Sequence, residues 1–180
     1  ERGKPVKERG RDVSRLYGRG TLNPESNVCY GEGGAGTYSD GKLYTRVNDP
    51  RFRHLLRVLV DNGAPERILV DTRPHIGTDK LIKLLRSLRS HLQSLGAEFR
   101  FETYAESFEV KNQALSAIAL RGGERIETSH AIIATGHSAH SVWHALQDAG
   151  AQLEARPFAV GFRIEHDQTQ INAVRYGREA

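Results

Sequence analysis

The chain has 180 residues, a formal net charge of +4 at pH 7 and a mean hydropathy of −0.54. This length is enough for one domain with a hydrophobic core, and no apolar run approaches the ~20 residues that a membrane-spanning helix needs. A single cysteine, Cys29, excludes an internal disulfide and a zinc site built from several cysteines. We therefore expect a cytoplasmic protein with no signal peptide and no membrane partner.

Helical periodicity predicts four helices and one long loop. Residues 21–49 are rich in Gly, Asn, Ser and Pro and have no periodicity, and a loop of this length is usually functional or disordered. The clearest helix has Thr78 as its expected N-cap and a stripe of leucines on one face. The predicted helices cover residues 12–19, 51–62, 79–95 and 139–149.

Short apolar or alternating runs predict strands between these helices. Residues 106–128 show two alternating runs separated by Asn112-Gln113 and closed by Gly122-Gly123, which predicts an antiparallel meander. Single strands are expected at residues 68–70, 97–103, 130–135 and 158–164. Together the elements predict an α/β fold with a small β insertion.

The basic residues are concentrated at the start of the chain. Seven of the 26 Lys and Arg and three of the 22 Asp and Glu lie in residues 1–20, so this segment carries +4 and the other 160 residues are neutral. Such a segment binds nucleic acid in some proteins, but Tyr17 is its single aromatic residue, and no stacking platform accompanies the charge. We favour a solvated helix face and keep a non-catalytic nucleotide- or RNA-binding module as the alternative function.

Residues 31–42 hold five glycines, hydroxyl groups and one lysine. Glycine adopts positive φ and lets backbone N–H groups approach an anion, and Thr37, Ser39 and Lys42 add side-chain donors. The segment is neither a Walker loop nor the GxGxxG fingerprint of dinucleotide-binding folds. A mobile surface loop is the alternative interpretation.

A second signal lies about a hundred residues later, in the run His130-Ala-Ile-Ile-Ala-Thr-Gly136. A short apolar run ending in Thr-Gly is typical of a buried parallel strand at its carboxyl end. Ligands of open α/β sheets bind outside these strand ends. Small residues there would suit close contact with a flat cofactor.

At these residues the sequence resembles a family of flavoproteins, the uncharacterised FAD-dependent dehydrogenases related to glutathione-reductase-like enzymes with two dinucleotide folds. The resemblance covers most of the chain, and its most specific parts are the long loop and the run Pro74-His75-Ile-Gly-Thr-Asp-Lys-Leu81. The other matching segments are residues 22–28, 134–139, 157–161 and 163–166.

The resemblance implies an incomplete Rossmann-like FAD/NAD(P)-binding domain. Residues 1–150 would form its greater part, with the meander at about 106–128 inserted and the GxGxxG unit missing, and residues 151–180 would start a substrate-side or interface region. A sequence that starts at Glu1 and contains no Met is expected to be a piece of a longer protein. We expect such a piece to be inactive, because the helix N-terminus that holds the pyrophosphate would be absent.

The same resemblance assigns site residues. Glu1 would accept hydrogen bonds from the adenosine ribose, Tyr104 and Ala105 would touch adenine, and Lys42 would place a cation near the flavin or remain a solvated lysine. FAD would carry electrons to or from a small-molecule substrate or redox partner, with NAD(P)H left open as donor, and the oligomeric state is not predicted. The implied cofactor residues are Glu1, Gly33, Gly34, Ala35, Gly36, Thr37, Ser39, Lys42, Tyr104, Ala105, Thr135 and Gly136.

The catalytic residues are unknown, and the candidates are Lys42 as a cation beside the flavin and His75 and His137 for proton transfer, with a structural hydrogen bond as the alternative role of each histidine. His137, His140 and His144 have spacings of three and four, which could align imidazoles along one helix edge. No Glu lies between them, as a zincin motif would require, so we predict no metal site.

Overall fold

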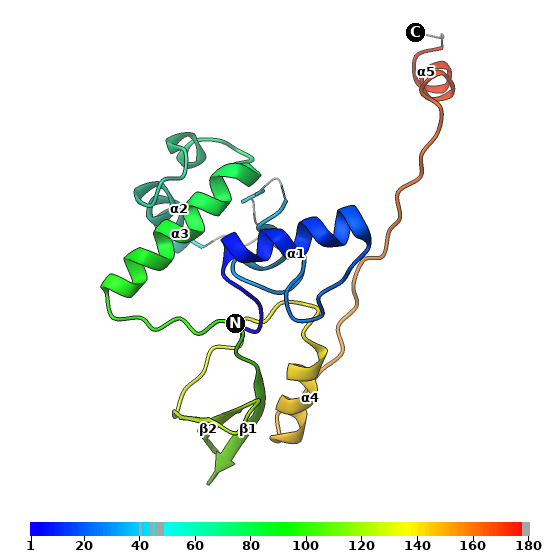
Figure 1. The fold of residues 1–180 in the computed structure, drawn as a ribbon. Helices are drawn as coiled ribbons and strands as arrows, with labels where there is room; N and C mark the ends of the chain where they lie inside the picture. The colour runs from blue at the N-terminus through cyan, green and yellow to red at the C-terminus, as the bar shows by residue number, and fades with distance from the viewer. Residues whose placement is uncertain (40, 44, 46–48, 178–180) are drawn as a thin grey trace.

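The computed structural model describes residues 1–39, 41–43, 45 and 49–177. It is a mixed α/β structure with a three-stranded antiparallel sheet, which confirms the expectation at that level (Figure 1). The sheet order is β1-β2-β3. In chain order the elements are α1 (Val6–Arg19), the 3₁₀ turn η1 (Gly34–Gly36), α2 (Arg51–Asp61), the 3₁₀ turn η2 (Glu66–Leu69), α3 (Thr78–Ser94), β1 (Ala105–Lys111), β2 (Ala114–Leu120), β3 (Arg125–Glu127), α4 (His140–Asp148) and α5 (Gln168–Tyr176).

The helices predicted from apolar periodicity are present, with shifted ends. α1 begins six residues earlier than expected, directly after Pro5, whose fixed φ of −54° suits a helix start. The expectation that Thr78 caps α3 is wrong. Gly77 occupies the cap position, and the Thr78 hydroxyl instead donates to the carbonyl oxygen of Ser39 at 2.6 Å, which joins α3 to the long loop.

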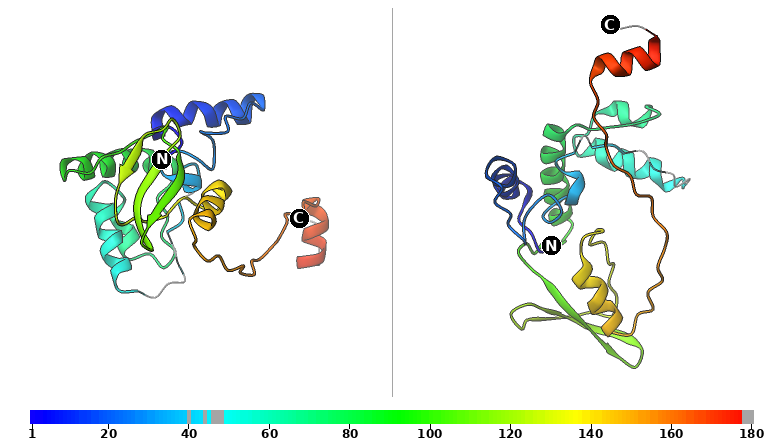
Figure 2. Two further views of the ribbon diagram at one scale, coloured as in Figure 1. Left: turned by 90° about the horizontal axis from the view of Figure 1, so that it is seen from below. Right: turned by 90° about the vertical axis from the view of Figure 1, so that its right-hand side faces the viewer.

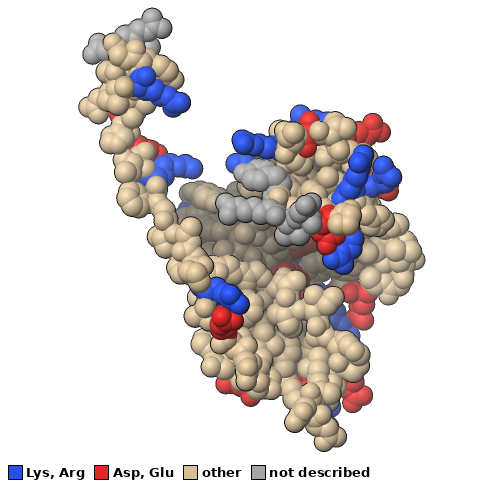
Figure 3. All heavy atoms as spheres, turned by 180° about the vertical axis from the view of Figure 1, so that it is seen from behind, with Lys and Arg blue, Asp and Glu red and all other residues tan. Residues whose placement is uncertain are grey.

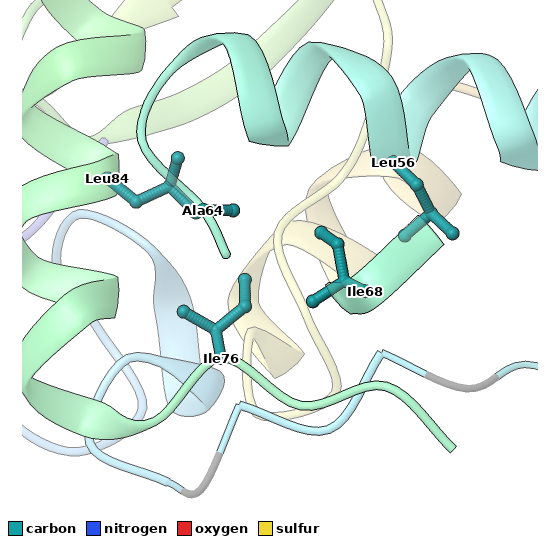
Figure 4. Packing of buried hydrophobic residues seen from close by; sticks show 5 residues of the cluster. All are labelled: Leu56, Ala64, Ile68, Ile76 and Leu84. Atoms are coloured by element: carbon teal, nitrogen blue, oxygen red, sulfur yellow. The ribbon is translucent and has the colours of Figure 1, made fainter. Parts of the chain in front are cut away.

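One hydrophobic core lies between α2, η2 and α3. Its buried residues are Leu56, Ala64, Ile68, Ile76 and Leu84 (Figure 4). The strand predicted at residues 68–70 is wrong: the segment forms a 3₁₀ turn in which the Ile68 N–H donates to the Pro65 carbonyl. The turn points Ile68 fully into the core, so burial of one side chain, and not strand pairing, explains the apolar run.

A second core lies where α4 packs on the meander. The meander at β1, β2 and β3 is confirmed, and Asn112 and Gln113 form its first turn with φ of 51° and 63°, the conformation of a tight hairpin. Phe108 of β1 packs against α4 through Val142 and Ala145. The sheet therefore has one face covered by a single short helix.

Three predicted strands are absent. Residues 97–103, 130–135 and 158–164 form no strand, because none of them pairs in a regular ladder with another described segment. Residues 1–3 do bond to residues 100–103, but Glu102 has a φ of 52°, which interrupts the ladder. The described residues therefore form a mixed α/β structure whose three-stranded sheet is antiparallel.

The C-terminal part leaves the body of the molecule. From α4, residues 151–167 run as an extended chain to α5, which projects beyond the other elements (Figure 2). Every residue from 151 to 171 is exposed. Among the described residues, none of the helices combines the length and apolarity needed to cross a membrane.

Truncation of the fully buried Ile68 to Ala should lower the free energy of unfolding by about 2–5 kcal/mol, because it removes buried methyl groups and leaves a cavity. The matched control is Val70→Ala two residues later, where the side chain is 81% exposed and the loss should stay within about 0.5 kcal/mol. Urea denaturation of both variants measures the difference. Equal losses would mean that η2 does not anchor this core.

Candidate functional site

The glycine-rich loop is built around the side chain of Arg9. This guanidinium is completely buried beneath the loop and donates to it from all three nitrogens. Burial lowers the pKa of Arg9; it stays charged because guanidinium is never deprotonated in proteins. Its acceptors are the carbonyl oxygens of Asn27 (2.8 Å), Val28 (3.0 Å), Gly31 (3.3 Å), Glu32 (2.8 Å) and Gly34 (2.8 Å) and the hydroxyl of Thr37 (3.1 Å).

Glu32 fastens the loop to two helices. One oxygen of its buried carboxylate accepts from the Val6 N–H at 2.7 Å and from Arg89 Nη1 at 3.1 Å. The first bond satisfies a free N–H at the start of α1, where a negative charge also complements the helix dipole. The second bond reaches α3. The loop is therefore held from below by Arg9 and from the side by α1 and α3.

Two glycines in this loop are required by their surroundings. A Cβ on Gly31, at φ of +121°, would lie 2.3 Å from Arg9 Cδ, and a Cβ on Gly33, at φ of +83°, would lie 2.2 Å from the Thr37 hydroxyl. Gly34 and Gly36 have no atom within 4 Å of such a Cβ. The loop is thus tight on its inner side and open on its outer side.

The open side of the loop forms one wall of a cavity of about 640 Å³, a size typical of small-molecule sites. The cavity is lined by loop residues, by the chain start, by the entrance to β1 and by the segment before α4. Eight residues predicted from the sequence to bind the cofactor line it: Glu1, Gly33, Gly34, Ala35, Tyr104, Ala105, Thr135 and Gly136. Of the three catalytic candidates, His75, His137 and Lys42, His137 lines it.

The other predicted site residues lie outside the lining of this cavity. Thr37 is buried and its hydroxyl donates to the Glu32 carbonyl at 3.0 Å, and the Ser39 hydroxyl donates to the Gly36 carbonyl at 2.7 Å. Lys42 pairs with His75 in an isolated β-bridge. His75 in turn has its Nε2 3.2 Å from Arg67 Nη2. Gly36 is exposed on η1, away from the lining.

Sequence reasoning missed a stack of cations and aromatic rings beside the cavity. Arg2 Cζ lies 4.0 Å from the ring centre of Tyr30 and 4.8 Å from that of Tyr104, and Arg121 Cζ lies 3.8 Å from Tyr104. Glu25 accepts from both arginines, at 2.7 and 3.3 Å. No sequence pattern signals this stack, since its members come from segments as far apart as Arg2 and Arg121.

Tyr30 joins the two glycine-containing walls of the cavity. Its hydroxyl donates to the Ser138 carbonyl oxygen at 2.6 Å, across 108 residues of sequence. Gly31, the next residue, donates its N–H to Glu1 Oε1 at 3.0 Å, and Gly3 donates to the same oxygen at 2.8 Å. One carboxylate oxygen of Glu1 is therefore engaged by main chain at the edge of the cavity.

Three of the seven basic residues at the start of the chain are engaged within the molecule. Arg9 is buried, Arg2 pairs with Glu25, and Lys4 pairs with Asp12 at 2.9 Å. On the face shown in Figure 3, Lys and Arg are interspersed with Asp and Glu. Lys7, Arg11, Arg15 and Arg19, by contrast, are exposed at intervals of four residues along α1, so the charge of this helix does not argue against the nucleic-acid alternative.

No metal centre is visible in the part of the chain that the structure describes, where no three His, Cys, Asp or Glu side chains are grouped to hold an ion. The rings of His137 and His140 meet edge to face, with centres 6.2 Å apart.

Comparison with known proteins identifies a relative but no family. No family model matches the chain. Over 177 residues, 98% of its length, it is 38% identical to an uncharacterized protein of Clostridium beijerinckii. The aligned part is 33% of that protein, so the chain spans about a third of the length of the curated relative it matches.

Replacement of Gly31 by Ala should lower the free energy of unfolding by about 2 kcal/mol or more, because the new Cβ collides with Arg9 and the backbone is in a positive-φ conformation. Gly36→Ala is the matched control in the same loop, with open space and an ordinary φ, and should change stability by less than about 0.5 kcal/mol. Thermal and urea unfolding compare the two. A Gly31 variant as stable as the Gly36 variant would contradict the fixed loop.

Stability should fall in acid because of Asp12 and Glu25. Burial opposes ionisation of Asp12, but its polar and charged neighbours, of which Lys4 contributes most, together outweigh it and lower its pKa, while the hydrogen bond from Arg2 lowers the pKa of Glu25. Since both pKa values are lower in the folded than in the unfolded chain, this stability is present at neutral pH and is lost as pH falls below roughly 4.

The measurement is urea unfolding at pH 7 and pH 3 for the parent chain, Asp12→Asn and Glu25→Gln. Each variant should be less stable than the parent at pH 7, and the gap should narrow at pH 3. Glu106→Gln, at an exposed position of β1, should keep the parent's pH dependence. A gap that stays constant with pH would show that these carboxylates are not the acid-sensitive groups.

Proposed function

We propose that this chain is part of a longer FAD-dependent oxidoreductase and that the 640 Å³ cavity holds part of the FAD. One observation carries the proposal. Gly33–Ala35 and Thr135–Gly136, a hundred residues apart and selected from sequence as two halves of one site, line the same cavity, and Glu1 lines it too. The share of the Clostridium relative that the chain covers supports the expectation of a longer protein.

The residues that line the cavity fit FAD. Gly34 and Gly136 have φ of +62° and +76°, and no other atom lies within 4 Å of the place that a Cβ would take on either, so the backbone at both walls is open to a ligand. A carboxylate such as Glu1 can accept from ribose hydroxyls, and its Oε2 is not among the oxygens that the main chain engages. Tyr104 and Ala105, which the resemblance assigns to adenine, also line the cavity.

FAD supplies hydride and electron transfer when it is bound, and the protein supplies position and electrostatics. In this proposal Gly33, Gly34 and Ala35 approach the cofactor with their main chain, and Thr135 and Gly136 close the opposite wall. His137 is the candidate to hold or move a proton, because it lines the cavity and an imidazole ring has both a donor and an acceptor nitrogen. The proposal gives no such role to Lys42 and His75, since they lie outside the lining.

Absorbance and fluorescence titration with FAD tests the proposal. The longer Clostridium protein is expected to show the visible absorbance of flavin in roughly equimolar amount, bleached by dithionite, whereas the 180-residue chain is expected to bind FAD weakly. In a chimera of that protein carrying this chain's residues 1–177, Ala35→Trp should fill the cavity and lower FAD affinity at least tenfold.

Ala97→Trp is the control, because Ala97 is exposed after α3 and lies outside the cavity lining. It should leave FAD affinity unchanged. Colourless longer protein that takes up no FAD would refute the proposal. Salt-sensitive binding of RNA by that colourless protein would instead favour the nucleotide- or RNA-binding alternative.

A further inference from the structure

The segment from Phe158 to Ile164 has the side-chain pattern of a strand with one apolar face. In an extended chain alternate side chains lie on the same face. Here the four alternate positions are all large and apolar, and the residues between them are small or charged. The apolar residues and their exposed fractions are Phe158 (81%), Val160 (81%), Phe162 (86%) and Ile164 (63%).

This pattern is unlike that of a flexible linker. Linkers are rich in Gly, Ser, Pro and charged residues, because a segment with large apolar side chains gains from burying them. Four large apolar side chains in seven residues, all on one face, form a continuous exposed apolar strip.

The backbone of this segment is unpaired on both edges. Among the described residues, none from 152 to 166 takes part in a backbone–backbone hydrogen bond with another segment. An extended chain with free N–H and C=O groups along both edges is a template for pairing with another strand. The segment thus offers both a sheet edge and an apolar face.

We propose that residues 158–164 form a strand that pairs with a sheet edge in the part of the longer protein outside these 180 residues. The Clostridium relative is aligned over 98% of this chain, which includes this segment, and two thirds of that relative lie outside the alignment. That additional sequence supplies the partner strand. The proposal is independent of FAD.

Two other partners would also bury the apolar face of residues 158–164: a groove of the same chain, and the same groove of a second copy. A groove of about 690 Å³ lies between the sheet and α4 and is lined by Phe108, Leu115, Ile133 and Leu146. Ala151 lies at this groove, but the following residues lead away from it toward α5 (Figure 2). The segment could fill the groove of its own chain or of a second copy, and the experiment below separates both cases from the proposal.

Hydrogen exchange without added flavin tests the pairing. The 180-residue chain at micromolar concentration should exchange the amides of residues 158–164 at unprotected rates. In the longer Clostridium protein the aligned amides should be protected at least a hundredfold. The amides of residues 117–120 in β2 should be protected in both proteins and so report that each is folded.

Three results would overturn the proposal. The first is equally fast exchange of the segment in both proteins. The second is protection in the 180-residue chain that does not depend on concentration, which would place the strand in its own groove. The third is protection that rises with concentration together with a dimer in light scattering, which would make a second copy the occupant.

A pair of variants tests the apolar face directly. In a chimera of the longer protein that carries residues 156–166 of this chain, Phe162→Asp should reduce protection of the segment at least tenfold, because it places a charge on the apolar face. Arg163→Asp, on the opposite face, should leave protection within threefold. Equal effects of the two variants, with the β2 amides still protected, would show that the apolar face makes no contact.

Discussion

The shape of the glycine-rich loop depends on one buried guanidinium. A charge without solvent needs acceptors on every donor, and Arg9 obtains them by turning five carbonyl oxygens and one hydroxyl inward. A backbone whose carbonyls converge on one point cannot keep ordinary dihedral angles throughout. Positive φ at Gly31 and Gly33 follows from this requirement, and so does the absence of any side chain facing Arg9 from Gly31.

The same constraint exposes the other side of the loop. Because the carbonyl groups of Gly31, Glu32 and Gly34 point toward Arg9, the main chain at Gly33–Ala35 presents its remaining surface to the cavity. Thr37 belongs to the inner side, although its sequence position suggested an outward donor. Its hydroxyl completes the shell around Arg9. The loop therefore offers a ligand mostly backbone.

Local patterns in the sequence were sufficient for the hairpins and for α1 to α4, whereas α5 was not predicted. The leucine stripe of α3 and the turn at Asn112-Gln113 are set by neighbours within a few residues, and both are present. Strands 97–103, 130–135 and 158–164 were not predictable in the same way, because a strand exists through its partner. Ile132 shows the consequence: an apolar side chain in a strand-like run is 95% exposed.

The candidate site was predictable only in part, because some of its residues are visible as local composition and others are defined only by the folded loop. Small residues at Gly33–Ala35 and Thr135–Gly136 are visible as composition, and they share a cavity. Arg9 looked like one of seven basic residues on a solvated helix, and nothing in its neighbourhood distinguishes it from Arg11. What distinguishes it is a set of acceptors 18 to 28 residues away. The positions of these acceptors depend on how the loop folds and follow no periodic pattern, so the sequence does not reveal them.

The two walls of the cavity are held with unequal strength. The wall at Gly33–Ala35 rests on the Arg9 network and on Glu32. The wall at Thr135–Gly136 rests on the Tyr30–Ser138 hydrogen bond and on the packing of Ile133 against the α4 core. A ligand that touches both walls would restrain the second more than the first, and part of its binding free energy would be offset by the lost freedom of that wall. Strand partners along residues 130–135 would remove this cost in advance, so affinity in this cavity should depend on how completely the surrounding sheet is formed.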